Sequence, residues 1–325
     1  MISDKENIAV IGAGYWGTII VNTLLKIKCK KIFIFDSNFN NIQLLSKRYP
    51  KLIACKTYLE ILKNDSIKSV FIATPPSVNF KICKKAIEYN KNIYVEKPVV
   101  KNLNQMLKLK KLLFKKKKVF MSGYVYCYND YINYIKKIIK RKSLGNIKYI
   151  NLIRKNFGPV RSDVSSNLDL SSHDISILLH LFNHKIKKIN CIDHSILKKN
   201  IFDINTTSYK IGKIKIDTNS SWLYPEKLRK IVIVGEKKML LYDEINSNEP
   251  IKIFDKYAKY PKIKFFENRF FDKKVKLYAG DSKVIKLRDT LPLVNELKHF
   301  FDCVKYKRKP LTSFNFAYEV LKILN

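Results

Sequence analysis

Over the first 122 residues, apolar positions alternate between short continuous runs and longer stretches in which they recur at helical spacing. The runs have the length of buried strands, and the longer stretches fit amphipathic helices. Strands are predicted at residues 7–11, 31–35, within 51–58, and at 68–73, 92–95 and 119–122. Helices are predicted at residues 18–28, 59–64, 78–90 and 102–114. This alternation predicts an α/β domain over residues 1–122, a doubly wound parallel sheet of the Rossmann type.

The pattern changes after residue 122. Helices are predicted at residues 129–142 and 172–182, with a strand at 147–157 between them, and strand patterns dominate residues 186–287. Two helices, at about 293–304 and 314–324, follow. Runs of strands after helices predict an α+β domain over residues 123–325 with an antiparallel or mixed sheet. We expect the last helix to pack back on the first domain.

The composition is strongly basic, with 64 Lys and Arg against 27 Asp and Glu in 325 residues and a formal net charge of +37. Such a charge commonly indicates nucleic-acid binding. Here lysine is spread along the whole chain together with abundant isoleucine and asparagine, as codon bias in an AT-rich genome produces. The densest run, Lys115 to Lys118, is interpreted as a solvated loop. We therefore expect no nucleic-acid partner, although the charge can attract an anionic substrate.

The cysteines and the hydropathy of the chain bear on metal binding, cell compartment and membrane association. No pair has the C-x-x-C spacing, so we expect no metal site and a reducing compartment, the cytoplasm. No apolar run is long enough to span a membrane, and the first residues lack the features of a signal peptide, so no membrane association is expected. The six cysteines are Cys29, Cys55, Cys83, Cys127, Cys191 and Cys303.

A glycine motif, G-x-G-x-x-G, lies between the first predicted strand and helix. Gly12 would permit a tight turn, Gly14 the approach of a pyrophosphate, and Gly17 close packing of the helix on its strand. The phosphates would bind at the N-terminus of the helix, around Tyr15 and Trp16. The alternative is a glycine-rich turn in another kind of α/β protein.

Asp36 ends the second predicted strand, about 20 residues past the glycines, where a carboxylate can accept hydrogen bonds from both adenine-ribose hydroxyls. A 2′-phosphate at this position would meet a like charge. Asp36 therefore favours NAD over NADP as the cofactor.

Two further strand ends face the same edge of the predicted sheet, where ligands of doubly wound folds bind. Ala73, Thr74 and Pro75 form a rigid loop there, for which a purely structural turn is the alternative. Glu96 and Lys97 follow the next strand. An ammonium group near a nicotinamide ring could orient a substrate hydroxyl and assist proton transfer. The alternative is one more surface lysine.

Asp169 and His173 are four residues apart, so a helical turn would bring them to one face. If Asp169 accepts a hydrogen bond from one imidazole nitrogen, the other is available to take a proton from a hydroxyl. The alternative is a helix N-cap followed by a buried, satisfied histidine. The other four histidines have no comparable acidic partner at this spacing.

Together these segments resemble the Gfo/Idh/MocA family of NAD(P)-dependent oxidoreductases, over nearly the whole chain. The resemblance rests on the glycine turn, Ala73 to Pro76, Glu96 to Pro98, the Asp169 to Ser176 segment, and the stretches 295–300 and 309–312. It implies a second domain with a large open, mostly antiparallel sheet that often serves for contacts in homodimers or homotetramers.

The resemblance also implies a site in which Lys97, Asp169 and His173 lie near the nicotinamide. Lys97 would hold and polarise a substrate hydroxyl, His173 would exchange the proton, and Asp169 would orient substrate or histidine. The segments 14–17 and 157–163 are most similar to members that act on nucleotide sugars, at the 3-hydroxyl of a UDP-N-acetylhexosamine or its uronate. Arg161 is then a candidate contact for phosphate or carboxylate, or else part of a surface ion pair.

Three departures from the family pattern bear on the substrate. Ser171 replaces a usual glycine, Ser176 a usual aspartate, and Tyr124 and Asp130 stand where many members have histidine and proline. Inositol or free-sugar oxidation therefore stays open as an alternative to a nucleotide sugar. So does an NAD-binding regulator without turnover.

Overall fold

A computed structural model describes residues 7–29, 31–114, 116–182, 184–259, 275–288 and 291–325. Three predictions concern residues outside these ranges. They are the solvated loop at Lys115, the character of the first six residues, and the strand pattern within 260–274. The chain forms two compact units, one made of Met1–Asn129 with Asp289–Asn325 and the other of Asp130–Arg288. The predicted boundary lay at residue 122, and the division into compact units falls at 129 and again at 288.

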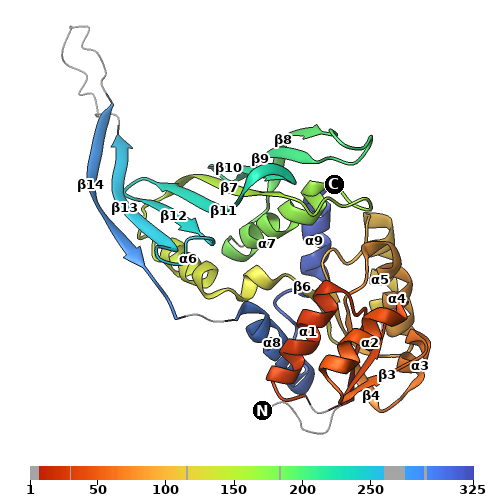
Figure 1. The fold of residues 1–325 in the computed structure, drawn as a ribbon. Helices are drawn as coiled ribbons and strands as arrows, with labels where there is room; N and C mark the ends of the chain where they lie inside the picture. The colour runs from red at the N-terminus through yellow and green to blue at the C-terminus, as the bar shows by residue number, and fades with distance from the viewer. Residues whose placement is uncertain (1–6, 30, 115, 183, 260–274, 289–290) are drawn as a thin grey trace, which may run out of the picture. The chain divides into compact units, whose positions relative to one another are not determined.

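The first unit is built on a six-stranded parallel sheet in the order β3-β2-β1-β4-β5-β6 (Figure 1). The order reverses between β1 and β4, and ligands of doubly wound folds bind at the carboxyl ends of the strands at such a reversal. The strands are β1 (Asn7–Ile11), β2 (Ile32–Phe35), β3 (Leu52–Ala54), β4 (Ile67–Ile72), β5 (Asn92–Glu96) and β6 (Phe120–Gly123).

Helices connect these strands, and several begin at a polar side chain that caps a backbone N–H. Asn38, Thr57 and Asn102 each accept such a bond from the first turn of their helix. The connecting helices are α1 (Tyr15–Lys26), α2 (Phe39–Arg48), α3 (Tyr58–Lys63), α4 (Pro76–Glu88) and α5 (Leu103–Leu113), and the 3₁₀-helix η1 (Val125–Tyr128) follows β6. The terminal helices α8 (Pro292–Tyr306) and α9 (Phe314–Leu324) also belong to this unit.

The second unit is an eight-stranded sheet in the order β14-β13-β12-β11-β7-β10-β9-β8 (Figure 1). Its neighbours are antiparallel except for the parallel pair of β7 and β10. The strands are β7 (Ile147–Phe157), β8 (Lys187–His194), β9 (Ile204–Ile211), β10 (Ile214–Ser221), β11 (Leu223–Gly235), β12 (Met239–Asp243), β13 (Ile251–Lys259) and β14 (Lys276–Ile285).

Three helical segments accompany this sheet: α6 (Asp130–Lys140), the short π-helix η2 (Asn167–Ser171) and α7 (Ser172–Leu181). A buried ion pair fixes α7 on the sheet, because Nε of Arg154 on β7 donates to Oδ1 of Asp174 at 2.9 Å. The two side chains are only 5% and 2% exposed. Burial raises the pKa of Asp174, and the Arg154 guanidinium opposes that rise.

The predicted fold class is confirmed: a Rossmann sheet is followed by a large, mostly antiparallel sheet. The predicted elements differ from the structure mainly at their ends, since α1 starts at Tyr15 and α4 at Pro76. Helix α2 was not predicted, because its sequence is mainly polar and buries only Ile42 and Leu45.

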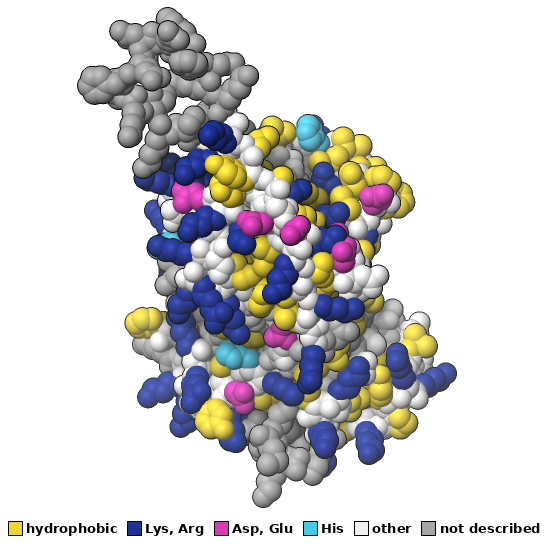
Figure 2. All heavy atoms as spheres, turned by 90° about the vertical axis from the view of Figure 1, so that its left-hand side faces the viewer, with side chains coloured by type: hydrophobic (Ala, Val, Ile, Leu, Met, Phe, Trp, Pro, Cys, Tyr) yellow, Lys and Arg dark blue, Asp and Glu magenta, His cyan; other side chains and the backbone are white. Residues whose placement is uncertain are grey.

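Basic side chains are scattered over the surface, and Figure 2 shows them over one whole face with few acidic groups between them. This distribution is the one expected from lysine spread along the chain. Within the described residues, no helix is both long enough and apolar enough to cross a bilayer.

Candidate active site

The glycine turn is shaped by close backbone contacts. Gly12 has a φ of +102°, and a Cβ there would lie 2.6 Å from the carbonyl oxygen of Ala73. A Cβ on Gly17 would lie 1.9 Å from the carbonyl oxygen of Gly12. A side chain at either position would therefore collide with backbone, which explains the first and third glycines of the motif.

Gly14 differs from these two glycines, because a Cβ on it would meet nothing within 4 Å. It is the N-cap of α1, and no side chain caps the backbone N–H groups of that helix. The next two residues, Tyr15 and Trp16, are 78% and 42% exposed. An uncapped helix N-terminus beside open space is a suitable binding site for a pyrophosphate.

Asp36 is bonded directly to this turn. Its Oδ2 accepts a 2.6 Å hydrogen bond from the backbone N–H of Ala13, and its Oδ1 accepts one of 2.8 Å from Asn38. A carboxylate offers about four lone-pair positions, so both oxygens can accept further bonds. Asp36 thus positions the turn and keeps lone pairs available for further donors.

The two other predicted loops are joined by Asn79 on α4, which is buried. Thr74 Oγ1 donates to Asn79 Oδ1 at 2.5 Å, and Asn79 Nδ2 donates to the carbonyl oxygen of Pro98 at 3.3 Å. The loops after β4 and β5 are therefore held in a fixed relation. Sequence reasoning missed Asn79, although an asparagine among the apolar positions of a predicted helix was a visible signal.

Glu96 and Lys97 end β5, and both are partly exposed. Burial raises the pKa of Glu96 to about 7, while the Tyr94 hydroxyl and Lys97 act in the opposite direction. Tyr94 Oη lies 3.0 Å from Glu96 Oε1 and 3.2 Å from Oε2 of Glu296 on α8. Sequence reasoning gave no role to Tyr94 or to Glu296, although Glu296 lay within the stretch that carried the resemblance.

In the second unit, Asp169 lies within the π-helix η2 and not in the regular helical turn that the spacing predicted. Its Oδ2 accepts a 3.3 Å bond from Nε1 of Trp222, which is fully buried. Single π-helical turns are frequent at functional sites. Trp222, one of only two tryptophans in the chain, was not predicted as part of the site.

Arg161 lies beside this aspartate. Its Nε and Nη2 each donate at 3.0 Å to the two carboxylate oxygens of Asp163, and its Nη1 lies 3.9 Å from Asp169 Oδ1. The guanidinium is about 31% exposed, so it forms a half-buried ion pair and still faces solvent. The ion pair weighed in the sequence analysis is present, and it includes the site residue Asp169.

His173 lies in the first turn of α7, directly before the buried Asp174, and its Nδ1 is itself buried. The neighbouring serines are bonded within the helical segment, because Ser172 Oγ donates to the carbonyl oxygen of Asp169 and Ser176 Oγ to that of His173. Ser176 is completely buried, so it offers no contact in place of the usual aspartate.

The predicted site residues are divided between the two units. The second unit holds Arg161, Asp169 and His173, and the first holds Gly12, Gly14, Tyr15, Trp16, Gly17, Asp36, Ala73, Thr74, Pro75, Glu96 and Lys97.

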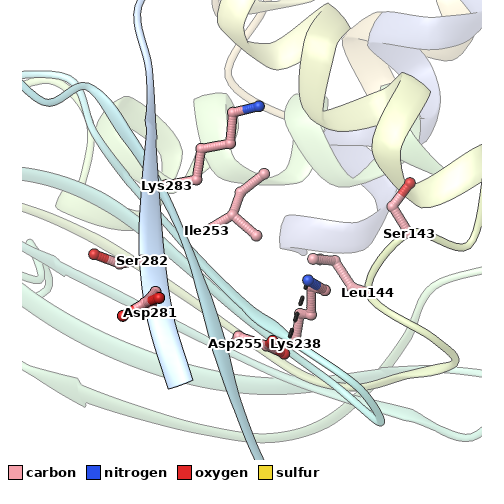
Figure 3. A pocket seen from close by; sticks show the side chains of 8 residues that line it. All are labelled: Ser143, Leu144, Lys238, Ile253, Asp255, Asp281, Ser282 and Lys283. Atoms are coloured by element: carbon pink, nitrogen blue, oxygen red, sulfur yellow. Dashed lines mark ion pairs between the residues drawn. The ribbon is translucent and has the colours of Figure 1, made fainter. Parts of the chain in front are cut away.

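A separate hollow of about 350 Å³ lies at the edge of the second sheet and is lined by residues of β13, β14, the turn after α6 and Lys238, which precedes β12 (Figure 3). An ion pair of 3.8 Å joins Lys238 and Asp255 within it. None of the predicted site residues lines this hollow.

Among the residues that the structure describes, no cluster of three or more His, Cys, Asp or Glu side chains is arranged to hold a metal ion.

Comparison with known proteins identifies the first unit. Residues 6–124 match the profile of the Gfo/Idh/MocA family, described as an oxidoreductase family with an NAD-binding Rossmann fold. Residues 6–124 are therefore similar to the NAD-binding Rossmann domain of that family, in agreement with the resemblance seen in the sequence.

Curated relatives are similar over part of their length. The chain is 23% identical over 186 residues to the uncharacterized oxidoreductase YrbE of Bacillus subtilis, a match that spans 55% of this chain and 54% of YrbE. It is 25% identical over 214 residues to oxidoreductase P35 of Formosa agariphila, over 57% of this chain and 66% of that protein. The matched region thus spans half to two thirds of these relatives.

Solved structures share the fold over almost the whole chain. UDP-N-acetylglucosamine 3-dehydrogenase GnnA of Acidithiobacillus ferrooxidans aligns with a TM-score of 0.76 at 17% identity, over 98% of this chain and 95% of GnnA. Levoglucosan dehydrogenase in complex with NADH and levoglucosan gives 0.78 at 14% identity, with coverages of 98% and 95%. The 3-ketoreductase KijD10 of Actinomadura kijaniata, in complex with NADP, gives 0.78 at 10% identity, with the same coverages.

Proposed function

We propose that this chain is a dehydrogenase that transfers a hydride between a secondary alcohol of a sugar and the nicotinamide of NAD. The observation that carries the proposal is the open, uncapped start of α1 at Gly14, with the Asp36 carboxylate bonded to the same turn. Glu96 and Lys97 end β5 at the same edge of that parallel sheet. The bound cofactor would supply the redox chemistry, and the protein would orient it and move the proton.

NAD is favoured over NADP because of Asp36. The carboxylate oxygens would accept the two adenine-ribose hydroxyls, and a 2′-phosphate would meet their negative charge. The N–H groups at the start of α1 would bind the pyrophosphate through the space that Gly14 leaves open.

The proton would be handled by Lys97 and His173. The Lys97 ammonium would hold and polarise the substrate hydroxyl, and His173 would take its proton during oxidation and return it during reduction. Asp169, fixed by Trp222 and adjacent to Arg161, would orient the substrate or the histidine. A carboxylate that accepts a hydrogen bond from a buried indole and lies beside a guanidinium is preorganised for such a role.

The favoured substrate is a UDP-N-acetylaminosugar oxidised at its 3-hydroxyl. Arg161 supports an anionic substrate, because its partly exposed guanidinium can bind phosphate or carboxylate oxygens in competition with Asp163. The likeness to GnnA, whose name states this chemistry, is consistent with the proposal at the level of the fold. We further propose that the protein is cytoplasmic, in keeping with cysteines that form no disulfide among the described residues, and that it is a homodimer or homotetramer.

A substrate panel tests this function. The purified protein is mixed with NAD and, separately, UDP-N-acetylglucosamine, myo-inositol or levoglucosan, and NADH is followed by absorbance. We expect turnover with the UDP-sugar. Turnover only with a free sugar or polyol would contradict the nucleotide-sugar assignment while leaving the dehydrogenase intact. Tight NAD binding without turnover on any of the three would favour a regulator.

A further inference from the structure

Two glutamates and one tyrosine form a hydrogen-bonded row behind the end of β5. The hydroxyl of Tyr94 lies between Oε1 of Glu96, at 3.0 Å, and Oε2 of Glu296, at 3.2 Å. All three residues belong to the first unit, although Glu296 comes from α8, far along the chain. The arrangement therefore links an acid deep in the unit to the proposed cofactor edge.

The inner part of this row is enclosed by apolar and aromatic groups. Tyr94 and Glu296 are fully buried, and the rings of Phe71 and Phe300 pack against the Tyr94 ring at 5.5 and 6.2 Å. Gly123 lies against the polar end, since a Cβ on it would be 2.7 Å from Tyr94 Oη. Water has little access to Glu296, so an ionised carboxylate there is strongly disfavoured.

Counting hydrogens shows that both contacts of Tyr94 can be hydrogen bonds only if one of the two carboxyl groups carries a proton. A tyrosine hydroxyl has one hydrogen, and an ionised carboxylate can only accept. Tyr94 can therefore donate to one of the glutamates, and the second contact is a hydrogen bond only if that glutamate is protonated and donates to the Tyr94 oxygen.

The proton is expected on Glu296. Burial and the charge of Glu96 raise its pKa well above the ordinary value, and the hydrogen bonds from Tyr94 and the Tyr124 N–H oppose this rise only in part. Glu96 is only partly buried, and the neighbouring Lys97 opposes the rise in its pKa that burial causes. Glu96 is thus the member of the pair that ionises.

The tyrosines and the histidine around the row stay neutral near pH 7. Tyr124 and Tyr128, which face it from the loop after β6 and from η1, have pKa values raised by burial. Cys127 lies between them on the same segment and raises the pKa of both tyrosines. On α8, His299 stacks on Tyr128 and its pKa is lowered by burial. None of these groups supplies a compensating charge to Glu296.

We propose that Glu296 is a positioning residue: as a neutral acid it donates to the Tyr94 oxygen, so that the Tyr94 hydroxyl donates to Glu96 and fixes that carboxylate beside Lys97. The pair then carries one negative charge, held on Glu96. Only the use of this charge toward a cofactor rests on the proposed function. The proton arrangement itself does not.

The test is a carboxyl titration by NMR of the full chain with ¹³C-labelled glutamate, without cofactor or substrate. Glu96→Gln and Glu296→Gln assign the two resonances. In the wild type we expect Glu296 to keep the shift of a protonated carboxyl at neutral pH, while Glu96 titrates near pH 7. An ionised Glu296 at that pH would overturn the proposal.

Two variants test the linkage. Glu296→Gln replaces one neutral group by another, so the pKa of Glu96 should stay within about half a unit of its wild-type value. If Glu296 were ionised, removing its charge would lower the pKa of Glu96 by a unit or more.

Tyr94→Phe removes a donor to ionised Glu96, so the pKa of Glu96 should rise, and an unchanged pKa would contradict the relay. Glu319→Gln, on the exposed side of α9, is the matched control and should leave Glu96 unchanged. Failure of the proposed dehydrogenase activity would not affect these readings.

Discussion

Asp36 accepts a hydrogen bond of 2.6 Å from the backbone N–H of Ala13, inside the glycine turn. The residue that would select the cofactor therefore also holds the loop that would bind the pyrophosphate. Changes at Asp36 should for this reason affect both the choice of cofactor and the strength of binding.

The first prediction concerns cofactor choice. Asp36→Ser removes the negative charge that would repel a 2′-phosphate and keeps a small polar side chain. We expect the ratio of kcat/KM for NAD to that for NADP to fall at least about 10-fold, as loss of one charged contact commonly produces. Asp281→Ser, an exposed aspartate of the second unit, is the control with the same charge change. An unaltered ratio in Asp36→Ser would remove Asp36 from the cofactor site.

Substitutions at Gly17 and Gly14 should have different effects on stability and on NAD binding. Gly17→Ala forces a Cβ against the Gly12 carbonyl, so we expect a loss of about 1–3 kcal/mol in the free energy of unfolding. Gly14→Ala meets no neighbour, so its stability should change by less than about 1 kcal/mol while NAD binding weakens. Urea denaturation and NAD titration by Trp16 fluorescence measure the two effects. Equal destabilisation by both substitutions would contradict the distinction.

Stability should depend on pH through Glu296. Its pKa is raised in the folded protein, so its contribution to stability is fully present below the unfolded pKa and is lost as the pH rises toward the folded value. Relative to Glu296→Gln, the wild type should therefore lose up to about 1.4 kcal/mol per pH unit between about pH 5 and pH 8. Urea denaturation across this range measures the difference. Parallel curves for the two proteins would mean that Glu296 is ionised in the folded state.

The proposed proton-transfer groups give a fourth prediction. Lys97→Ala and His173→Ala should each lower kcat by roughly 100-fold or more while NAD still binds, because proton transfer contributes to the reaction and little to cofactor affinity. Lys108→Ala and His184→Ala, both exposed, are the matched controls and should keep wild-type turnover. Wild-type turnover in both site variants would exclude this mechanism.

Much of the fold could be predicted because its signals are local. The strand at Asn7–Ile11 and the helix at Phe314–Leu324 match the predicted ranges, since a buried strand and an amphipathic helix carry their periodicity in the sequence. The π-helical turn at Asp169 carries no such signal. Its geometry depends on contacts with β10 and on Trp222, which lies 53 residues further along the chain.

In the candidate site, too, residues with local sequence signals could be predicted and residues placed by contacts between distant segments could not. Gly12, Gly17 and Asp36 were predictable because each occupies a fixed place in a short strand–turn–helix unit. Asn79 gave a signal as a polar residue among apolar helix positions, but its partner Pro98 could not be predicted, and neither could the contact of Glu296 with Tyr94, because both arise from packing between separate segments. No spacing in the sequence indicates that a buried glutamate on the penultimate helix meets a tyrosine on β5.

The most direct test of the central claim follows the transferred atom. The protein is incubated with NAD and UDP-N-acetylglucosamine that carries deuterium at C3, and the nicotinamide product is examined by mass spectrometry. Our account predicts that the reduced cofactor carries the deuterium and is one mass unit heavier than with unlabelled sugar. Unlabelled NADH would contradict hydride transfer from C3, and absence of any reduced cofactor despite NAD binding would contradict the proposed reaction with this sugar.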